Sequence, residues 1–546
     1  MQGELEGLLP DMPGSDTGWT SVTTVGDLLV RAAELWGEES CFIHPERRLD
    51  FRSALQAGTA VARGLVGLGV GRGQHVGIFM PNRAEFVAAF FGCQFVGAVA
   101  VPINARYKAD DLAYIVDHAN LAAVLTCPRS HRQTLESLVH EAVAESASTV
   151  VPVVVLGEAA HPLSLGSSEL EAFAAGVPVE EVEDRRAMVR VRDVAMMMYT
   201  SGTTARPKGV PLTHEALVRT ATQLANRYGI SSDDRFWNPL PLFHMGALVP
   251  FLACVGTGAA FCTMTRFEAE PALSQIGQET CTFLYPAFPT ITQSLVQSPA
   301  FETADLSAVR GVLAVGTPEV LQRVQEEFPG AAVVSSYGLT ETGGISVTCS
   351  PDESRDARLT CGRPFTGMEV AVLDEETGRT VYAGTRGEIL LRGVGLFEGY
   401  FRDDELTERT VDRDGWFHTG DLGSLDGHGR LTFRGRTKDM LKVGGENVAA
   451  LEIETFLQGH MSVKLAQVVG VPDKKLHEIP AAFVELRHGH ELTEEDILDY
   501  CRDRIASFKI PRHVRFTDHW PMSASKVQKF KLREQLLSEL HIEEQA

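Results

Sequence analysis

Apolar runs of two lengths alternate along the first two thirds of the chain. Short runs typical of buried strands stand at 75–80, 122–127, 150–157, 194–200 and 331–338. Longer stretches with helical spacing, such as 51–69 and 271–281, lie between them. Continuous short apolar runs are typical of parallel strands that are covered on both faces. The alternation of such strands with helices predicts an α/β fold.

The pattern changes twice toward the C-terminus. From about residue 361 the polar and apolar positions alternate more strictly, which indicates a smaller β-rich unit. After Arg436 the pattern predicts a helix at 450–458 and strands at 464–471 and 479–487. Thr493 and Asp496 form a capping-box pattern, which predicts that a second helix begins there. We therefore expect a large N-terminal domain over 1–436, with stacked α/β subdomains and a β-rich subdomain, and a small α+β C-terminal domain over 437–546.

Two apolar stretches approach the length of a membrane span. The stretch 86–103 contains Gln94 and ends in a β-branched piece, and 245–264 is interrupted by Pro250 and two glycines. In both stretches the pattern indicates a buried helix that runs into a buried strand, rather than a transmembrane helix.

Charge and cysteine content narrow the class of protein. The formal net charge of the 546 residues is −22, which argues against a broad nucleic-acid or anionic-membrane surface. The nine cysteines form no close pairs, as expected of reduced intracellular thiols, and the acidic N-terminus lacks the pattern of a secretory signal. We expect a cytoplasmic protein, and the oligomeric state stays open, a homodimer included.

The segment "YTSGTTARPKGV" at 199–210 is the first candidate for chemistry. It follows an apolar strand with Gly, hydroxyl and cationic residues, a composition that can bind phosphate through backbone N–H groups and Lys208. It is not a Walker A loop, because Pro207 and the spacing do not fit that motif. Taken alone, the composition also fits an ordinary surface turn.

Four further segments follow in order. They are "SSYGLTETGG" (335–344), "GWFHTGD" (415–421), "GRTKDMLKVGGEN" (435–447) and "PMSASKVQKFKLRE" (521–534). The first places Thr340 and Glu341 at the carboxyl end of a buried strand, where open α/β sheets bind ligands.

Together these segments resemble the successive core motifs of the adenylate-forming (AMP-binding) superfamily, which includes acyl-CoA synthetases, peptide adenylation domains and firefly luciferase. The segments at 69–86 and 97–107 add to the match, which covers nearly the whole chain. The resemblance implies a two-step ligase. ATP and a carboxylic acid give an acyl-adenylate and pyrophosphate with the help of Mg²⁺, and the thiol of CoA then displaces AMP.

The resemblance also implies a role for each motif residue in binding ATP. Asp421 and Arg436 would bind the ribose, Thr340 the α-phosphate, and Glu341 the Mg²⁺ ion. Tyr337 would stack on adenine, with Gly316, Thr317 and Pro318 along its other edge. The loop over the β- and γ-phosphates would comprise Thr200, Ser201, Gly202, Thr203, Thr204 and Lys208.

Other residues would serve the acid and CoA. Lys526 would reach the substrate carboxylate and the α-phosphate, and the mobile C-terminal domain would swing about Lys438 to bring Gly445 beside the pantetheine arm. The acyl pocket would be lined by His244, Gly246, Ala247, Ala287, Gly338 and Gly344, with His244 also a catalytic candidate. A packed histidine remains an alternative for that residue.

Two positions depart from the family pattern. Ala205 stands where the phosphate loop normally has Gly, and the glycine that normally precedes the catalytic lysine is missing before Lys526. If the register differs there, Lys529 is the alternative lysine. These departures also feed another hypothesis, a degenerate homologue that binds nucleotide or acyl-AMP as a sensor or scaffold. A luciferase-like oxygenase is a third, rarer reading.

The acceptor is expected to be CoA, because no carrier domain follows the lysine motif. An amino-acid substrate is disfavoured, since no carboxylate stands in "PLFHMG" (241–246) to meet an α-ammonium group. The small residues of the expected pocket favour a medium-length or branched aliphatic acid, or an aryl acid.

Overall fold

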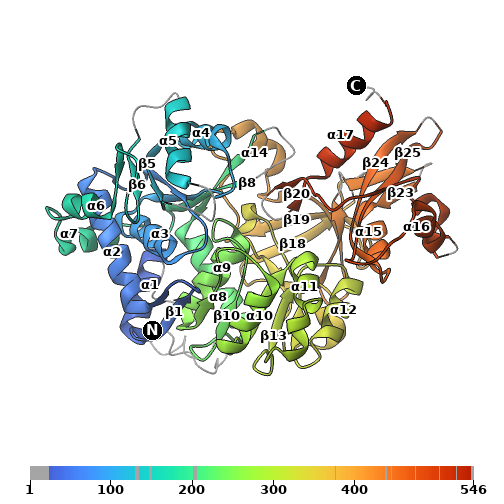
Figure 1. Ribbon diagram of the computed structural model, residues 1–546, viewed down its shortest axis with the longest axis horizontal. Helices are drawn as coiled ribbons and strands as arrows, with labels where there is room; N and C mark the ends of the chain where they lie inside the picture. Colours follow the sequence, from blue (N-terminus) through green and yellow to red (C-terminus); the bar gives the residue numbers. More distant parts are fainter. Residues whose placement is uncertain are drawn as a thin grey trace, which may run out of the picture.

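The computed structural model describes residues 24–128, 134–146, 151–200, 206–374, 377–436, 439–443, 446–473, 475–502, 504–523 and 526–542. A large body, coloured blue to yellow in Figure 1, is followed by a smaller orange-to-red body at one end.

The first seven-stranded sheet comes from the N-terminal part of the chain. Its order is β7-β6-β5-β3-β4-β8-β9, and all neighbours are parallel except β8 and β9. The strands are β3 (His75–Phe79), β4 (Val99–Pro102), β5 (Leu121–Thr126), β6 (Val153–Val155), β7 (Ser164–Leu165), β8 (Val194–Thr200) and β9 (Lys208–Thr213). Its helices are α2 (Phe51–Gly67), α3 (Ala84–Val96), α4 (Ala109–His118), α5 (Leu135–Glu145), α6 (Ser167–Ala174) and α7 (Val179–Ala187). The strands predicted from 75, 122, 150 and 194 are confirmed.

The second seven-stranded sheet has the order β14-β13-β12-β10-β11-β1-β2 and is parallel except at β1 and β2. Its strands are β1 (Ser40–Ile43), β2 (Arg48–Asp50), β10 (Arg235–Trp237), β11 (Ala260–Cys262), β12 (Phe283–Ala287), β13 (Gly311–Ala314) and β14 (Ala332–Val334). Its helices are α1 (Val25–Trp36), α8 (His214–Tyr228), α9 (Met245–Thr257), α10 (Ala269–Gln278), α11 (Pro289–Val296), α12 (Pro318–Glu327) and the 3₁₀ helix η2 (Pro299–Thr303).

One hydrophobic core joins the two sheets. Helices from both units pack against each other, so that Phe91 of α3 meets Phe251 of α9 at 6.1 Å between ring centroids. Helix α3 carries apolar residues on all its faces, and every residue in it except Glu85 is buried. The stretches 86–103 and 245–264 thus form the expected pairs of buried helix and strand, α3 with β4 and α9 with β11. Within the described residues, no helix combines the length and apolar character that crossing a membrane requires.

The single strand expected over 331–338 is wrong. The segment divides into β14, which is parallel to β13, and β15 (Ser336–Tyr337), which pairs antiparallel with β16 (Val347–Thr348). Pairing of Ser336 with Thr348 and of Tyr337 with Val347 takes the chain into a different sheet, and the hydroxyl of Thr348 also donates to the Ser335 carbonyl oxygen over 2.8 Å. The short strand β17 (Arg363–Pro364) completes that sheet.

The β-rich unit is confirmed as a four-stranded antiparallel sheet, β18-β19-β20-β21. Its strands are β18 (Met368–Leu373), β19 (Gly387–Gly393), β20 (Phe417–Leu425) and β21 (Leu431–Arg436). The connections carry α13 (Arg355–Arg358), α14 (Asp404–Thr410) and the 3₁₀ helix η3 (Thr340–Thr342).

Residues from 439 onward build a sheet with the order β23-β22-β25-β24, and β26 is parallel to β25. One core on this sheet includes α15 and α16, and the other includes α17. The elements are β22 (Met440–Val443), β23 (Glu446–Ala449), α15 (Ala450–Gln458), β24 (Val463–Asp473), β25 (His477–Leu486), α16 (Glu494–Cys501), η5 (Ser507–Lys509), β26 (His513–Phe516), β27 (Met522–Ser523), β28 (Lys526–Val527) and α17 (Lys529–Glu539). The capping box of Thr493 and Asp496 is confirmed.

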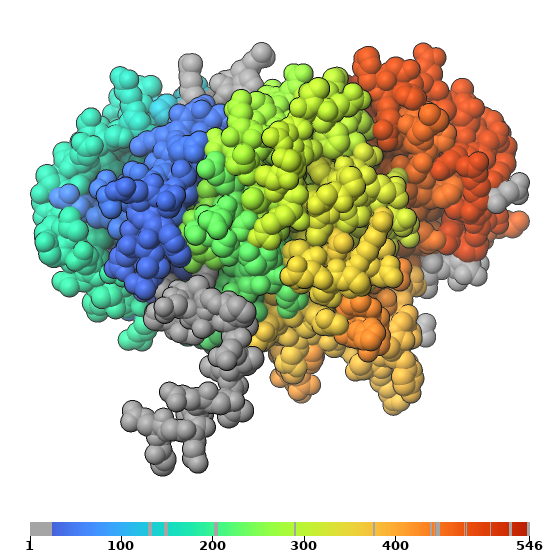
Figure 2. Space-filling model, turned by 90° about the horizontal axis from the view of Figure 1, so that it is seen from below, coloured from blue at the N-terminus to red at the C-terminus, as the bar shows by residue number. Residues whose placement is uncertain are grey.

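The smaller body packs on the side of the large one that carries α11 and α12. The guanidinium of Arg323 on α12 donates to the Gln458 carbonyl oxygen at the end of α15, over 2.9 Å. Figure 2 shows these orange-to-red residues set directly against the yellow-green ones.

Candidate active site

Four neighbouring strands of the second sheet deliver predicted site residues to one edge. In the order β14-β13-β12-β10, the carboxyl ends lead to Tyr337, Gly316, Ala287 and His244. The backbone N–H of Val315 donates to the Ala287 carbonyl oxygen over 2.7 Å, which joins two of these ends. Carboxyl ends of parallel strands are where open α/β sheets bind ligands.

The predicted nucleoside residues form one hydrogen-bonded cluster. The Tyr337 hydroxyl donates to Asp421 Oδ2 over 2.9 Å, and Arg436 Nε lies 3.2 Å from Asp421 Oδ1. Asp421 and Arg436 face each other across β20 and β21, and the Asp421 side chain is only 6% exposed. Burial and the neighbouring Asp421 carboxylate hold the pKa of Tyr337 well above its ordinary value, so the phenol remains a donor.

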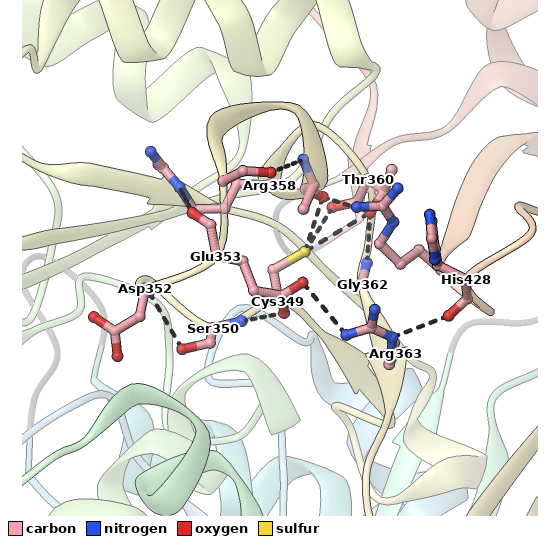
Figure 3. Close-up of polar contacts among 12 residues, drawn as sticks. Cys349, Ser350, Asp352, Glu353, Arg358, Thr360, Gly362, Arg363 and His428 are labelled. Atoms are coloured by element: carbon pink, nitrogen blue, oxygen red, sulfur yellow. Dashed lines mark hydrogen bonds and ion pairs between the residues drawn. The ribbon is translucent and has the colours of Figure 1, made fainter.

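Strand β17 and the loop before it connect the sheet of Tyr337 with the sheet of Asp421. Figure 3 shows Arg363 between two partners: its Nε donates to the His428 carbonyl oxygen over 3.0 Å, and its Nη1 lies 3.6 Å from Glu353. Glu353 also accepts from the Ser350 N–H over 3.1 Å. His428 belongs to the turn between β20 and β21, so Arg363 of β17 ties the sheet that carries Tyr337 to the sheet that carries Asp421 and Arg436.

A second cluster surrounds Glu341. Its Oε1 accepts a 2.9 Å hydrogen bond from the hydroxyl of Tyr400, and the Lys208 ammonium lies 5.4 Å from the centre of the Tyr400 ring. Burial and the Glu341 carboxylate raise the pKa of Tyr400, which keeps its hydroxyl a donor. Sequence reasoning missed Tyr400, because it lies 59 positions from Glu341 and no local pattern links them.

Thr317 lies at the N-terminal end of α12, beside Gly316 and before Pro318 at the first helical position. Its buried hydroxyl has no hydrogen-bond partner in the part of the chain that the structure describes. Buried hydroxyls normally find a partner, so this one is available to a ligand at the sheet edge.

The predicted acyl residues meet around the start of α9. A Cβ atom at Gly338 would lie 2.4 Å from the Gly344 carbonyl oxygen, and one at Gly344 (φ +95°) would lie 2.7 Å from Met245 Cβ. These two glycines therefore allow the turn after Tyr337 to pack closely on α9. A Cβ at Gly246 would lie 3.9 Å from the hydroxyl of Tyr285, a β12 residue that sequence reasoning did not single out.

His244 and Ala287 flank this region. His244 is the N-cap residue of α9, with its ring 5.3 Å from that of Phe243. Ala287 adopts φ +55°, a left-handed conformation that is unusual for a residue other than glycine. Strained backbone of this kind is often found at functional sites, and here it lies at the last residue of β12.

Several predicted residues lie outside the described residues: Ser201, Gly202, Thr203, Thr204, Ala205, Lys438 and Gly445. Thr200 and Lys208 are paired across β8 and β9. They are the first and last residues of the predicted phosphate loop, 200–208, which we call the phosphate segment. The backbone of Lys526 pairs with Ser523 in the β27–β28 hairpin, and its side chain is not among the described ones.

The alternative lysine, Lys529, has partners in its own domain. Its ammonium lies 2.7 Å from Glu454 and 3.6 Å from Asp439. The Glu454 side chain is 4% exposed and also accepts from the Val468 N–H over 2.7 Å. Burial alone would lower the pKa of Lys529, but the two carboxylates outweigh it and raise that pKa above its ordinary value. This geometry gives Lys529 a structural task.

Comparison with known proteins agrees with this architecture. Residues 29–401 match the AMP-binding enzyme family, and residues 452–526 match the AMP-binding enzyme C-terminal domain. The chain is 35% identical over 520 residues to the 3-[(3aS,4S,7aS)-7a-methyl-1,5-dioxo-octahydro-1H-inden-4-yl]propanoyl:CoA ligase of Mycobacterium tuberculosis, covering 94% of this chain and 98% of that protein. It is 30% identical over 527 residues to the mitochondrial medium-chain acyl-CoA ligase ACSF2 of Danio rerio, covering 92% and 86% of the two chains.

The fold is likewise shared with a solved enzyme. The crystal structure of the anthranilate CoA ligase AuaEII in complex with anthranoyl-AMP superimposes with a TM-score of 0.84 at 27% identity, covering 95% of this chain and 99% of that one. With the family match, the chain is a member of the AMP-binding enzyme family and an AMP-forming acid–CoA ligase.

Proposed function

We propose that this ligase activates a medium-length or branched aliphatic acid, or an aryl acid, as its acyl-adenylate and transfers the acyl group to CoA. The observation that carries the proposal is the cluster of Tyr337, Asp421 and Arg436. Asp421 is a buried anionic acceptor suited to ribose hydroxyls, and Thr340 and Glu341 follow Tyr337 by only a few residues.

In the first half-reaction, a carboxylate oxygen of the acid attacks the α-phosphorus of ATP, and the bond to the β-phosphate oxygen breaks. Thr340 and Lys526 would stabilise charge on the α-phosphate, and Lys208 with residues 200–204 would hold the leaving pyrophosphate. Fixed donors aimed at developing charge are the main source of such catalysis.

The Glu341 carboxylate is a suitable ligand for a magnesium ion. Tyr400 engages one carboxylate oxygen, and no hydrogen bond within the described residues reaches Oε2. Mg²⁺ commonly binds through one or two carboxylates together with substrate phosphates. When bound, it would supply neutralisation of the phosphate charge.

In the second half-reaction, the CoA thiol loses its proton to solvent and its sulfur attacks the acyl carbonyl carbon. The bond from that carbon to the phosphate oxygen breaks, and AMP leaves with the bonding electrons. We assign the ATP and acyl sites to a domain over 1–436, and Lys526 and Gly445 to a domain over 437–546 that turns about Lys438. Lys526 can then withdraw after the first step, and Gly445 leaves room for the pantetheine arm.

The similar ligases support the substrate class. Their names give a bicyclic propanoate, medium-chain acyl groups and anthranilate, all larger than acetate. Gly246, Ala247 and Ala287 are small residues near the expected acyl position. Because the similar proteins are named as ligases, we disfavour the hypothesis that this chain only binds nucleotide without turnover. We also place the reaction in the cytoplasm, because all nine cysteines are free and buried thiols.

The test is pyrophosphate release with ATP and Mg²⁺ across short, medium, branched and aryl acids, with and without CoA. We expect release with medium, branched or aryl acids, and acyl-CoA and AMP in equal amounts when CoA is present. Activity confined to acetate or to amino acids would overturn the substrate class, and ATP binding without release for any acid would overturn the reaction.

A further inference from the structure

Helix α4 contacts the far end of the phosphate segment through Tyr114. The Tyr114 hydroxyl donates to the Pro207 carbonyl oxygen over 3.1 Å. The Arg206 guanidinium carbon lies 4.9 Å from the centre of the same ring, within the range of a cation–π contact. Both partners lie directly before Lys208, so one side chain holds this stretch of backbone in two ways.

The next turn of α4 contacts the near end of that segment. His118 Nδ1 lies 2.7 Å from the hydroxyl of Tyr199, the residue before Thr200. The Tyr114 and His118 rings also stack at 5.1 Å, as the four-residue spacing on a helix allows. Tyr114 and His118, which we call the α4 platform, therefore touch the backbone or side chains on both sides of residues 201–205.

The platform also contacts the segment that carries Tyr400. The Phe401 ring meets His118 edge to face at 5.6 Å, and Arg402 Nη1 donates to the His118 carbonyl oxygen over 3.1 Å. The Phe401 N–H donates to the Gly209 carbonyl oxygen over 2.9 Å, next to Lys208. One helix thus supports both Lys208 and the tyrosine that binds Glu341.

Tyr114 and His118 make polar contacts in addition to their packing. The core-facing side of α4 consists of Leu112, Ile115 and Val116, which are fully buried. Tyr114 and His118 are only half-buried and point their polar atoms toward the phosphate segment.

We propose that Tyr114 and His118 are positioning residues that fix Tyr199 and Pro207, and with them Lys208, and thereby determine affinity for the β- and γ-phosphates of ATP. The inference rests on the proposed role of Lys208 in ATP binding. It predicts a selective effect, because AMP lacks the two phosphates that Lys208 would hold.

The experiment compares the dissociation constants of ATP and AMP by calorimetry on the full chain. Tyr114→Leu removes the hydrogen bond and the ring beneath Arg206, and we expect it to weaken ATP binding about fivefold to tenfold while AMP affinity stays within about twofold. Tyr114→Phe keeps the ring and should weaken ATP binding less. Asp110→Asn, an exposed change on the same helix, is the matched control and should alter neither ligand.

Kinetics give a second readout. In the variants with an altered platform, we expect the KM for ATP to rise more than kcat falls. Equal weakening of ATP and AMP would show a purely structural role and overturn the inference, and so would unchanged ATP affinity in Tyr114→Leu. A wild-type chain that binds both nucleotides but releases no pyrophosphate would overturn the proposed reaction, and the comparison of ATP with AMP would still decide the role of the platform.

Discussion

The hydroxyl of Tyr337 lies 2.9 Å from Oδ2 of Asp421, although the two residues are 84 positions apart and belong to different sheets. Arg436 approaches the other oxygen of the same carboxylate at 3.2 Å. A buried carboxylate with directional donors on both sides is held in one orientation. The three residues that we propose bind the nucleoside are thus held in one arrangement by their own contacts.

Asp421→Asn should weaken ATP and AMP alike, because both nucleotides carry the ribose that Asp421 would bind. Losing a charged acceptor costs about 1.5–3 kcal/mol per hydrogen bond, so we expect at least about tenfold weaker binding. Calorimetry with each nucleotide measures this. Asp414→Asn, on an exposed turn, is the control, and unchanged dissociation constants in Asp421→Asn would remove the residue from the nucleotide site.

Glu341→Gln should raise the Mg²⁺ concentration needed for half-maximal pyrophosphate release about tenfold, because a neutral amide is a poorer ligand for a hard cation. Tyr400→Phe should raise it about threefold, since one oxygen of Glu341 loses its hydrogen bond. Magnesium titrations of the wild type and both variants test this.

The matched control is Tyr382→Phe, because Tyr382 is 91% exposed and is not one of the predicted site residues. If the magnesium dependence were the same in all four proteins, Glu341 would not hold the metal.

Lys526→Ala and Lys529→Met should fail in different ways. Lys526→Ala should slow adenylate formation about hundredfold or more, yet leave thioester formation from supplied acyl-AMP largely intact. Lys529→Met leaves the buried Glu454 carboxylate without its cation and should lower domain stability by about 2–4 kcal/mol.

Half-reaction assays and thermal unfolding separate these outcomes. If the Lys529→Met protein were stable but had lost adenylate formation selectively, Lys529 rather than Lys526 would be the catalytic lysine.

His214 should make the fold sensitive to acid. Its Nδ1 accepts the Val25 N–H over 3.1 Å, and burial lowers its pKa from 6.5 to about 4. The unfolded chain therefore takes up this proton first, so stability is complete above about pH 7 and falls as the pH drops from 6.5 toward 4, by about 3 kcal/mol at most.

Chemical denaturation at pH 7 and pH 5 measures this loss. His214→Asn keeps an acceptor near the Nδ1 position without a titrating group, so the difference between the two pH values should shrink. His519→Asn, at a 93% exposed side chain, should leave the difference unchanged, and an unchanged difference in His214→Asn would contradict the assignment.

The strands near 75, 122 and 194 and the helix that Thr493 begins could be predicted because their signals are local. Apolar runs and a capping box depend on neighbours within a few residues. The strand over 331–338 could not be predicted correctly, because β16, the strand with which Ser336 and Tyr337 pair, lies outside that segment.

The order of motifs along the sequence determined the family and therefore the expected identity of Tyr337, Glu341, Asp421 and Arg436 as site residues. Only the tertiary structure decided which of them touch, and that Tyr400 contacts Glu341. It also decided that Glu454 engages Lys529 and that α4 contacts both Tyr199 and Pro207. These pairings join residues far apart along the chain. They depend on how strands and loops pack in space, and no periodicity within one segment encodes them.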